Sequence, residues 1–243
     1  MADDTMRLAV LIDADNAQPA IIADLMSEIA KLGAAIVKRI YGDFTSQNLK
    51  SWSTVARDHS IQPIQQFANT VGKNASDSAL IIDAMDLLHT KKFDGFCIVS
   101  SDSDFTRLAT RVREDGLQVF GFGEKKTPKS FVAACNRFIY TEILRERPAI
   151  PSKGIAEIKD SGLLALLRDA VEDSAGDDGW AALQLIGQLL NKRRPDFDTR
   201  SFGYRNLSSL VEATGRFDLE RRGKKGGPQH VFVRAKASGK RAG

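Results

Sequence analysis

Aspartates follow three apolar segments in the first half of the chain, at the point where each segment ends. Asp13 and Asp15 follow LAVLI, Asp43 follows RIYG, and Asp102 and Asp104 follow FCIVSS. Turn or N-cap chemistry explains any one of them. Carboxylates that converge, however, repel one another unless a cation neutralises them. Oxygen ligands without His or Cys favour Mg²⁺ or Mn²⁺ over zinc, and such an ion can activate water in phosphodiester cleavage.

A further carboxylate comes from the segment 76–88, whose apolar spacing predicts a helix. On a helical wheel Asp77 lies within about 40° of the apolar stripe, near the helix N-terminus. Asp83 and Asp86 lie about 120° and 180° from Asp77. We therefore expect Asp77 to face the interior with the strand-end aspartates, although a capping role would also explain it. Asp86 is expected to be a surface charge, and Asp83 is left undecided.

Other polar residues flank these carboxylates. Asn16 is expected to bind a metal or its water, in preference to capping the next helix. Ser100 and Ser101 either contact a phosphate and orient the carboxylates or have ordinary turn roles. Lys73 and Asn74 precede the predicted helix, where they are placed to meet a substrate phosphate. Helix N-termini at this edge would also assist the binding of anions.

The first 145 residues alternate short apolar runs with longer amphipathic stretches. This pattern is typical of a doubly wound α/β domain, in which helices cover both faces of a parallel sheet. The carboxyl ends of such strands share one edge, where ligands bind, so we expect the aspartates at that edge. The predicted strands are 8–12, 35–41, 61–67, 95–100 and 118–122, and the predicted helices are 19–32, 46–58, 76–90, 103–114 and 128–135.

Several other classes of protein lack their sequence signatures here. There is no GxxxxGK[ST] loop and no GxSxG, and the loop after the first strand is DADNAQP where a dinucleotide site would have GxGxxG. Cys97 and Cys135 lack the spacing of a zinc site or a disulfide framework. No apolar run is long enough for a membrane span, and the acidic N-terminus is unlike a secretory signal. We therefore expect a cytoplasmic protein.

The second part of the chain is basic. Residues 192–243 carry 14 lysines and arginines against 5 acidic residues, which indicates a surface that faces a polyanion. The segment RERPAIPSKG (145–154), with two prolines and no periodicity, separates this part from the first. From residue 155 the chain has the pattern of a winged helix, with helices at 155–173, 180–190 and 201–214 and a hairpin at 216–220 and 230–234.

The first part resembles the NYN domain, a branch of the PIN-like metal-dependent ribonucleases. The segments that carry the resemblance are LIDADN (11–16), IYGDF (40–44), GKNASDSALIIDAMDLL (72–88) and IVSSDSDF (98–105). It implies a PIN-like sheet and Mg²⁺- or Mn²⁺-dependent endonucleolytic cleavage of RNA, usually single-stranded. By position it implies metal-binding carboxylates at Asp13, Asp77 and Asp102. The supporting positions that it implies for metal, water or substrate are Asp43, Asp104 and Asn16, and Asp83 also matches the family pattern.

The second part resembles the OST-HTH/LOTUS winged helix through PDFDTRSFGYRNLSSLVEATGRFDLERR (195–222) and HVFVR (230–234). The resemblance implies RNA binding or the docking of a protein partner. Phe197, Phe202 and Tyr204 either stack on bases or, as we favour, pack the core of this small domain. Basic residues beside the third helix and at the tip of the wing would contact phosphates without reading sequence. These residues are Arg193, Arg194, Arg200, Arg205, Arg221, Arg222, Lys224 and Lys225.

The chain is therefore expected to divide into four parts. These are a nuclease domain over 1–145, a linker over 146–154, a winged helix over 155–236 and a basic tail over 237–243. The winged helix would capture RNA and raise its local concentration at the nuclease domain. The oligomeric state is left open.

The leading hypothesis is a metal-dependent endoribonuclease that cleaves single-stranded RNA. Asp13, Asp77 and Asp102 would bind one or two Mg²⁺ or Mn²⁺ ions, with Asp43 or Asp104 completing the site. Two alternatives stay open. The first is a catalytically inactive RNA-binding adaptor, and the second is a phosphatase or flap-type DNA nuclease with the same carboxylate chemistry.

Overall fold

The computed structural model of the chain describes residues 5–67, 75–145, 160–223 and 229–236. The predicted linker over 146–154 and tail over 237–243 lie outside these residues, and so do Lys73, Asn74, Lys224 and Lys225. The chain divides into two compact units, Met1–Arg147 and Pro148–Gly243. Among the described residues, no helix has the length and apolar character needed to cross a membrane.

The first unit is built on a six-stranded sheet in which every neighbouring pair of strands is parallel. The strand order is β3-β2-β1-β4-β5-β6, so the chain reverses its direction of winding between β1 and β4. In sheets of this order, ligands bind beyond the carboxyl ends of the strands at that switch point. The strands are β1 (Arg7–Asp13), β2 (Ala34–Gly42), β3 (Gln62–Gln65), β4 (Gly95–Val99), β5 (Gln118–Gly123) and β6 (Arg137–Tyr140).

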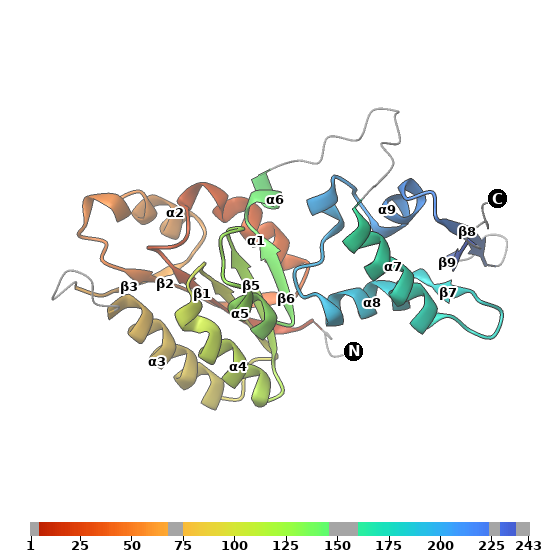
Figure 1. Cartoon of the computed structure of the whole chain (residues 1–243). Helices are drawn as coiled ribbons and strands as arrows, with labels where there is room; N and C mark the ends of the chain where they lie inside the picture. The colour runs from red at the N-terminus through yellow and green to blue at the C-terminus, as the bar shows by residue number, and fades with distance from the viewer. Residues whose placement is uncertain (1–4, 68–74, 146–159, 224–228, 237–243) are drawn as a thin grey trace. The chain divides into compact units, whose positions relative to one another are not determined.

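Helices cover both faces of this sheet (Figure 1). Residues of β1 alternate between two hydrophobic cores, because successive side chains of a strand point to opposite faces. Leu8, Val10 and Ile12 pack in one core, and Ala9 and Leu11 pack in the other. The first core is covered by α1 (Ile22–Ala30), α2 (Trp52–Asp58) and α6 (Glu142–Arg145), and the second by α3 (Ala75–His89), α4 (Thr106–Glu114) and α5 (Lys129–Ala134). Short 3₁₀ turns are η1 (Pro19–Ile21), η2 (Gln47–Leu49) and η3 (Ser103–Phe105).

The expected α/β class with a doubly wound parallel sheet is confirmed. Strand β6 was not among the predicted strands. It has only 4 residues, and only two residues separate it from the end of α5. Its apolar pair Phe138 and Ile139 therefore looks in the sequence like a continuation of the apolar residues of that helix. Both side chains are buried, one in each core.

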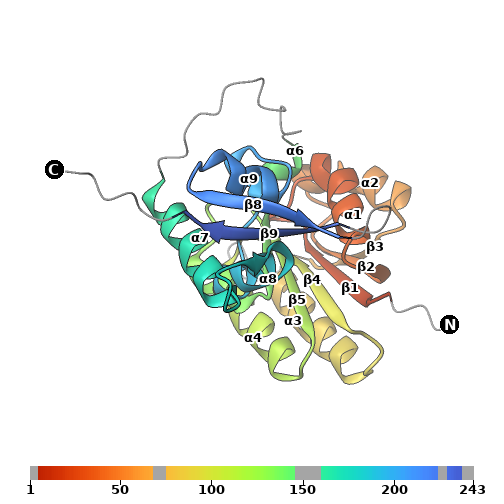
Figure 2. The ribbon, with the colours of Figure 1, turned by 90° about the vertical axis from the view of Figure 1, so that its right-hand side faces the viewer.

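The second unit packs three helices against a small antiparallel sheet of order β7-β9-β8. Figure 2 shows β8 and β9 lying side by side as a hairpin. Phe197 is buried in its core, and Phe202 and Tyr204 pack against it, as favoured from the sequence. The elements are α7 (Ser161–Ser174), β7 (Ala181–Ala182), α8 (Leu183–Arg193), η4 (Thr199–Phe202), α9 (Leu207–Ala213), β8 (Phe217–Arg222) and β9 (His230–Ala235).

Two features of this unit differ from the sequence prediction. The expected helix over 201–214 is divided, because η4 ends at Phe202 and is followed by Gly203, whose φ of 81° is left-handed. Asn206 then caps α9, where its side chain accepts a hydrogen bond from the backbone N–H of Ser209. Strand β7 is only 2 residues long, too short for a period of two to show in the sequence.

Candidate metal centre

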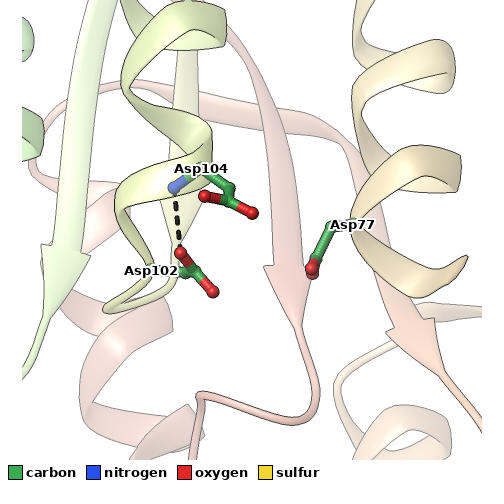
Figure 3. Close-up of side chains that lie close together, drawn as sticks. All are labelled: Asp77, Asp102 and Asp104. Carbon is green, nitrogen blue, oxygen red and sulfur yellow. Dashed lines mark hydrogen bonds between the residues drawn. The ribbon is translucent and has the colours of Figure 1, made fainter. Parts of the chain in front are cut away.

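Three carboxylates converge at the carboxyl edge of the first unit's sheet. Asp77, Asp102 and Asp104 each place one carboxylate oxygen within 4.8 Å of the others. Asp77 lies in the first turn of α3, and the other two lie in the loop after β4. Figure 3 shows Asp77 pointing from the helix toward this loop. Because all three donors are carboxylate oxygens, the set suits hard cations such as Mg²⁺ or Mn²⁺.

The loop after β4 is shaped by its own aspartate. Asp102 caps η3, because its Oδ1 accepts a 2.9 Å hydrogen bond from the backbone N–H of Asp104. This is the N-cap role that the residue type alone suggests. The same cap leaves the Asp102 side chain partly buried and the Asp104 side chain exposed, both on the side that faces Asp77. Capping and metal binding are therefore compatible at this position.

Asp13, the last residue of β1, is buried with only 1% of its surface exposed. The alternation along β1 puts it on the same face as Ala9 and Leu11, which is the face covered by α3. A shift of one residue in the register of β1 would turn it to the opposite face. Strand register, and not local sequence, therefore directs this carboxylate toward Asp77.

Both oxygens of Asp13 accept hydrogen bonds. Oδ1 accepts from the backbone N–H of Asp15 at 3.0 Å. Oδ2 accepts from Asn16 Nδ2 at 2.8 Å and from Ser100 Oγ at 2.7 Å. Burial raises the pKa of Asp13, and these three donors oppose that rise. Asn16 and Ser100 are thus placed to orient Asp13, as expected for residues that support a metal ligand.

The carboxyl group of Asp77 is partly buried and lies among other carboxylates. Its pKa is raised to about 6, first by burial and then by the negative charges of Asp13, Asp102, Asp104 and Asp15. Four carboxylates thus act on one partly buried carboxyl group. A bound cation would remove this repulsion, and the donor set therefore fits a divalent metal.

The N-terminal end of α3 is hydrogen-bonded to the loop after β1. Ser76 Oγ donates a 3.2 Å hydrogen bond to Asp15 Oδ2, one residue before Asp77. Asp15 is exposed, and its charge contributes to the raised pKa of Asp77. This contact gives Asp15, which was expected at this edge of the sheet but was assigned no role there, a part in holding the end of the helix beside β1.

Asp43 follows β2, which is separated by β1 from β4, the strand that precedes Asp102 and Asp104. The Oδ1 of Asp43 accepts hydrogen bonds from the Thr45 backbone N–H at 3.1 Å and from Gln65 Nε2 at 2.8 Å. The Thr45 hydroxyl donates to the same oxygen at 2.5 Å. These contacts connect the ends of β2 and β3, so the structure gives Asp43 a turn role at the edge of the site.

Ser100 and Ser101 have different partners although they are adjacent. Ser100 Oγ donates to Asp13 and accepts a 3.0 Å hydrogen bond from the Asp102 backbone N–H. Ser101 Oγ accepts a 2.9 Å hydrogen bond from the backbone N–H of Glu124, which directly follows β5. Of the two roles weighed for this pair, Ser100 orients carboxylates and Ser101 joins two loops.

Asp83 contacts residues that the sequence did not single out. Its two carboxylate oxygens accept hydrogen bonds from Arg39 and from the Tyr41 hydroxyl, both on β2. Arg39 and Asp83 also form an ion pair, with 26% and 22% of their side chains exposed. Burial is the main cause of the raised pKa of Tyr41, followed by its hydrogen bond to Asp83. Asp83 therefore connects α3 to β2 through these contacts. Asp86 is exposed, as expected.

Of the basic residues expected to bind RNA in the second unit, some form ion pairs and others are exposed. Arg193 pairs with Asp173. Arg194 pairs with Asp196 at 3.3 Å, and Arg200 pairs with Asp198 at 2.7 Å, with only 20% of the Arg200 side chain exposed. Arg205 and Arg221 are exposed.

Arg222, the last residue of β8, lies over two aromatic rings. Its guanidinium lies 5.1 Å from the ring centre of Trp180 and 4.6 Å from that of Phe232. It also pairs with Asp178 at 3.3 Å and with Glu220 at 3.2 Å. Contacts of this kind stabilise a sheet face by cation–π attraction, and two carboxylates already offset its charge.

Comparison with known proteins gives two domain matches. Residues 7–144 match the NYN domain, and residues 155–228 match the OST-HTH/LOTUS domain. Comparison with curated proteins finds no match. Among solved structures, a protein of unknown function from Vibrio parahaemolyticus is similar at 16% identity and a TM-score of 0.47, over 57% of this chain and 94% of that chain. An uncharacterized protein from Nitrosomonas europaea is similar at 42% identity and a TM-score of 0.28, over 30% of this chain and 72% of that chain.

Proposed function

This chain belongs to the NYN domain family, and we propose that it is a Mg²⁺- or Mn²⁺-dependent endoribonuclease that cleaves single-stranded RNA. The observation that carries the proposal is the convergence of Asp77, Asp102 and Asp104 within 4.8 Å. Asp13 lies buried beside them, and the negative charges of Asp13, Asp102 and Asp104 all raise the pKa of Asp77. Residues that only cap helices would have no reason to converge in this way.

The four aspartates would hold the cation, and Ser100 and Asn16 would hold Asp13 in place for it. A divalent cation, when bound, supplies positive charge that polarises a phosphoryl oxygen and stabilises the departing oxygen. The chain's own contribution is to bring carboxylates from β1, α3 and the loop after β4 to one edge and to orient them. The remaining expected residue, Asp43, would support the site from the end of β2.

The second unit supports a role in RNA binding through its match to the OST-HTH/LOTUS domain. We propose that it captures RNA through exposed cations, of which Arg205 and Arg221 are described, and so raises the local concentration of substrate. The proposed organisation is a nuclease domain over 1–145, a linker over 146–154, a winged helix over 155–236 and a tail over 237–243. Docking of a protein partner on the winged helix remains the alternative role.

The test is a cleavage assay on a labelled single-stranded RNA in Mn²⁺, Mg²⁺ or EDTA. The wild-type chain is compared with Asp102→Asn and with Asp86→Asn, which changes an exposed carboxylate of α3 outside the cluster. We expect metal-dependent cleavage in the wild type and in Asp86→Asn and its loss in Asp102→Asn, with RNA binding retained. Cleavage that survives in Asp102→Asn would overturn the site assignment.

Two further arms decide between the alternatives. A single-stranded DNA of the same sequence and a small phosphoester are offered to the same preparations. Preferential cleavage of DNA, or hydrolysis of the small phosphoester, would replace the endoribonuclease proposal by a different phosphoesterase with the same site. RNA binding without cleavage in any metal would identify the chain as an RNA-binding adaptor.

A further inference from the structure

A second loop contacts the loop after β4, which carries Asp102 and Asp104. It is the β5–α5 loop, residues 124–128, which follows the strand next to β4 (Figure 1). The backbone N–H of Glu124 donates the 2.9 Å hydrogen bond to Ser101 Oγ, one residue before Asp102. Gly123 is in equally close contact, since a Cβ at this position would lie 2.5 Å from the Ser100 carbonyl oxygen. The β5–α5 loop therefore begins beside Ser100 and Ser101, the two residues that precede Asp102.

This loop is rich in positive charge. Lys125 and Lys126 lie within it, Lys129 follows at the start of α5, and all three are exposed. Arg145, at the end of α6, is also exposed. It donates a hydrogen bond to Gln18, and Gln18 Nε2 donates to Glu124 Oε1 at 2.9 Å. Arg145 therefore lies near the start of the β5–α5 loop.

Two carboxylates share this surface with the four cations. Lys126 pairs with Glu124 at 2.8 Å, and Glu142 Oε1 accepts a 2.8 Å hydrogen bond from the backbone N–H of Lys125. The positive charges still exceed the negative ones. The surface thus has the opposite sign to the aspartate cluster beside it.

The backbone of the loop is held by contacts that do not use the lysine side chains. The Lys125 N–H is bound by Glu142, and the Glu124 carbonyl accepts from the Thr127 backbone N–H at 2.9 Å and from the Thr127 hydroxyl at 2.6 Å. Thr127 itself is buried, with 6% of its surface exposed. The lysines are therefore presented from a fixed turn, which lowers the entropy lost when they bind a partner.

We infer that the β5–α5 loop is a binding site for the phosphates of an RNA strand, in which Lys125 and Lys126 contact phosphates next to the one at the carboxylates. The inference rests on the proposed function and deepens it. An edge that presents only aspartates repels a polyanion, so cations beside the cluster are needed to hold the strand there. Lysine binds phosphate as a point charge, and such contacts position a strand without reading its sequence.

The chain offers a matched control for these two residues. Lys91 and Lys92 are also adjacent, exposed and in a loop, but they precede β4 and so lie at the opposite, amino edge of the sheet. The pairs Lys125→Gln/Lys126→Gln and Lys91→Gln/Lys92→Gln remove the same charge from the two edges. A third variant, Lys125→Arg/Lys126→Arg, keeps the charge and tests whether any loss comes from misfolding.

Binding is measured in the full chain by the anisotropy of a labelled single-stranded RNA over a series of KCl concentrations. The protein carries Asp102→Asn and EDTA is present, so that the RNA is not cut and no divalent ion competes for its phosphates. Each phosphate contact to a single strand adds about 0.7 to the slope of log K against log salt concentration, so Lys125→Gln/Lys126→Gln should lower the slope by about 1.4. The arginine pair should keep the slope, and the Lys91/Lys92 pair should not change it.

The outcomes separate this inference from the proposed function. Equal slopes for the two glutamine pairs would overturn the inference, whether or not the wild type cleaves RNA. If the wild type does not cleave in any metal, the proposed function fails, and the slope still decides the role of the loop. In Mn²⁺, with Asp102 restored, the Lys125→Gln/Lys126→Gln pair should raise KM and leave kcat unchanged, because it removes binding that is equal in the ground and transition states.

Discussion

The hydroxyl of Ser100 donates a 2.7 Å hydrogen bond to Oδ2 of Asp13 and so joins the end of β4 to the end of β1. The same hydroxyl oxygen accepts a 3.0 Å hydrogen bond from the backbone N–H of Asp102. One small side chain thus sets the positions of two proposed metal ligands from neighbouring strands. These strands flank the point at which the winding of the sheet reverses.

We predict that Ser100→Ala weakens the binding of Mn²⁺ by about 10- to 100-fold, the usual effect of losing a partner that orients a metal ligand. Isothermal titration of the full chain with Mn²⁺ measures this change. Ser101→Ala is the matched control, because Ser101 is also buried but bonds to Glu124 and not to Asp13. Equal losses in the two variants would show that Ser100 has no special role in the metal site.

Asp77→Asn should stabilise the metal-free protein at neutral pH. The pKa of Asp77 is about 6 in the folded state, above its usual value of 3.8, so the folded state binds more protons than the unfolded state between these values. The stability due to this group therefore falls as pH rises from about 4 to about 6 and stays low above that. Because Asp77 is only partly buried, solvent screening limits the effect to about 1–2 kcal/mol.

The measurement is the free energy of unfolding of wild type and Asp77→Asn in EDTA from pH 4 to pH 8. The difference should be full above pH 6 and should vanish toward pH 4. In Mn²⁺ at pH 7 the wild type should become more stable than Asp77→Asn, because the ion stabilises only the chain that binds it. An Asp77→Asn variant that is less stable than wild type in EDTA at pH 7 would contradict the proposed electrostatics.

Asp83→Ala should destabilise the first unit by about 2–3 kcal/mol, since it leaves the half-buried Arg39 and the buried Tyr41 without this partner. Unfolding in urea can be followed by the fluorescence of Trp52, buried in the first unit, in a chain that also carries Trp180→Phe. Asp86→Ala, on the exposed side of the same helix, should change stability by less than about 0.5 kcal/mol. Loss of Mn²⁺ binding without loss of stability in Asp83→Ala would instead make Asp83 a direct part of the metal site.

We predict that Arg200 supports the stability of the second unit, whereas Arg205 contributes to RNA binding. Arg200→Ala removes the partner of Asp198, whose side chain is 7% exposed, and should destabilise the second unit by about 2–4 kcal/mol. Arg205→Ala should leave stability unchanged within about 0.5 kcal/mol. It should lower the salt slope of single-stranded RNA binding by about 0.7 if Arg205 contacts one phosphate. Thermal unfolding and RNA anisotropy on both variants check these outcomes, and the opposite pattern would reassign the two arginines.

Much of the fold could be predicted because its signals are local. The strands β1, β2, β4 and β5 are short apolar runs, and α3 has the spacing of an amphipathic helix, so each can be recognised within a single window of sequence. Strand β6 could not, because Phe138 and Ile139 have no period of their own in 4 residues. Their place in the sheet depends on pairing with β5, whose partner residues lie 17 positions earlier in the chain.

The candidate site likewise has a part that could be predicted from the sequence and a part that could not. The residue types and their positions indicated aspartates at strand ends and Asp77 at the start of a helix, and the resemblance to the NYN domain implied Asp13, Asp77 and Asp102 as metal ligands. The partners of Asp83 could not be predicted, because Arg39 and Tyr41 lie 44 and 42 residues away and their contact depends on how α3 packs on β2. The contacts of Arg222 with Trp180 and Phe232 likewise depend on the pairing of three short strands.

Composition and local spacing are enough to show that carboxylates lie at the ends of the apolar strands and that a basic domain follows them. The order of the strands was decided only by the tertiary structure. Because β1 lies next to β4, Ser100 can reach Asp13, while Asp43 at the end of β2 is left at the margin of the site. Strand order and register arise from non-local pairing and packing, and these decide which of several similar aspartates come together.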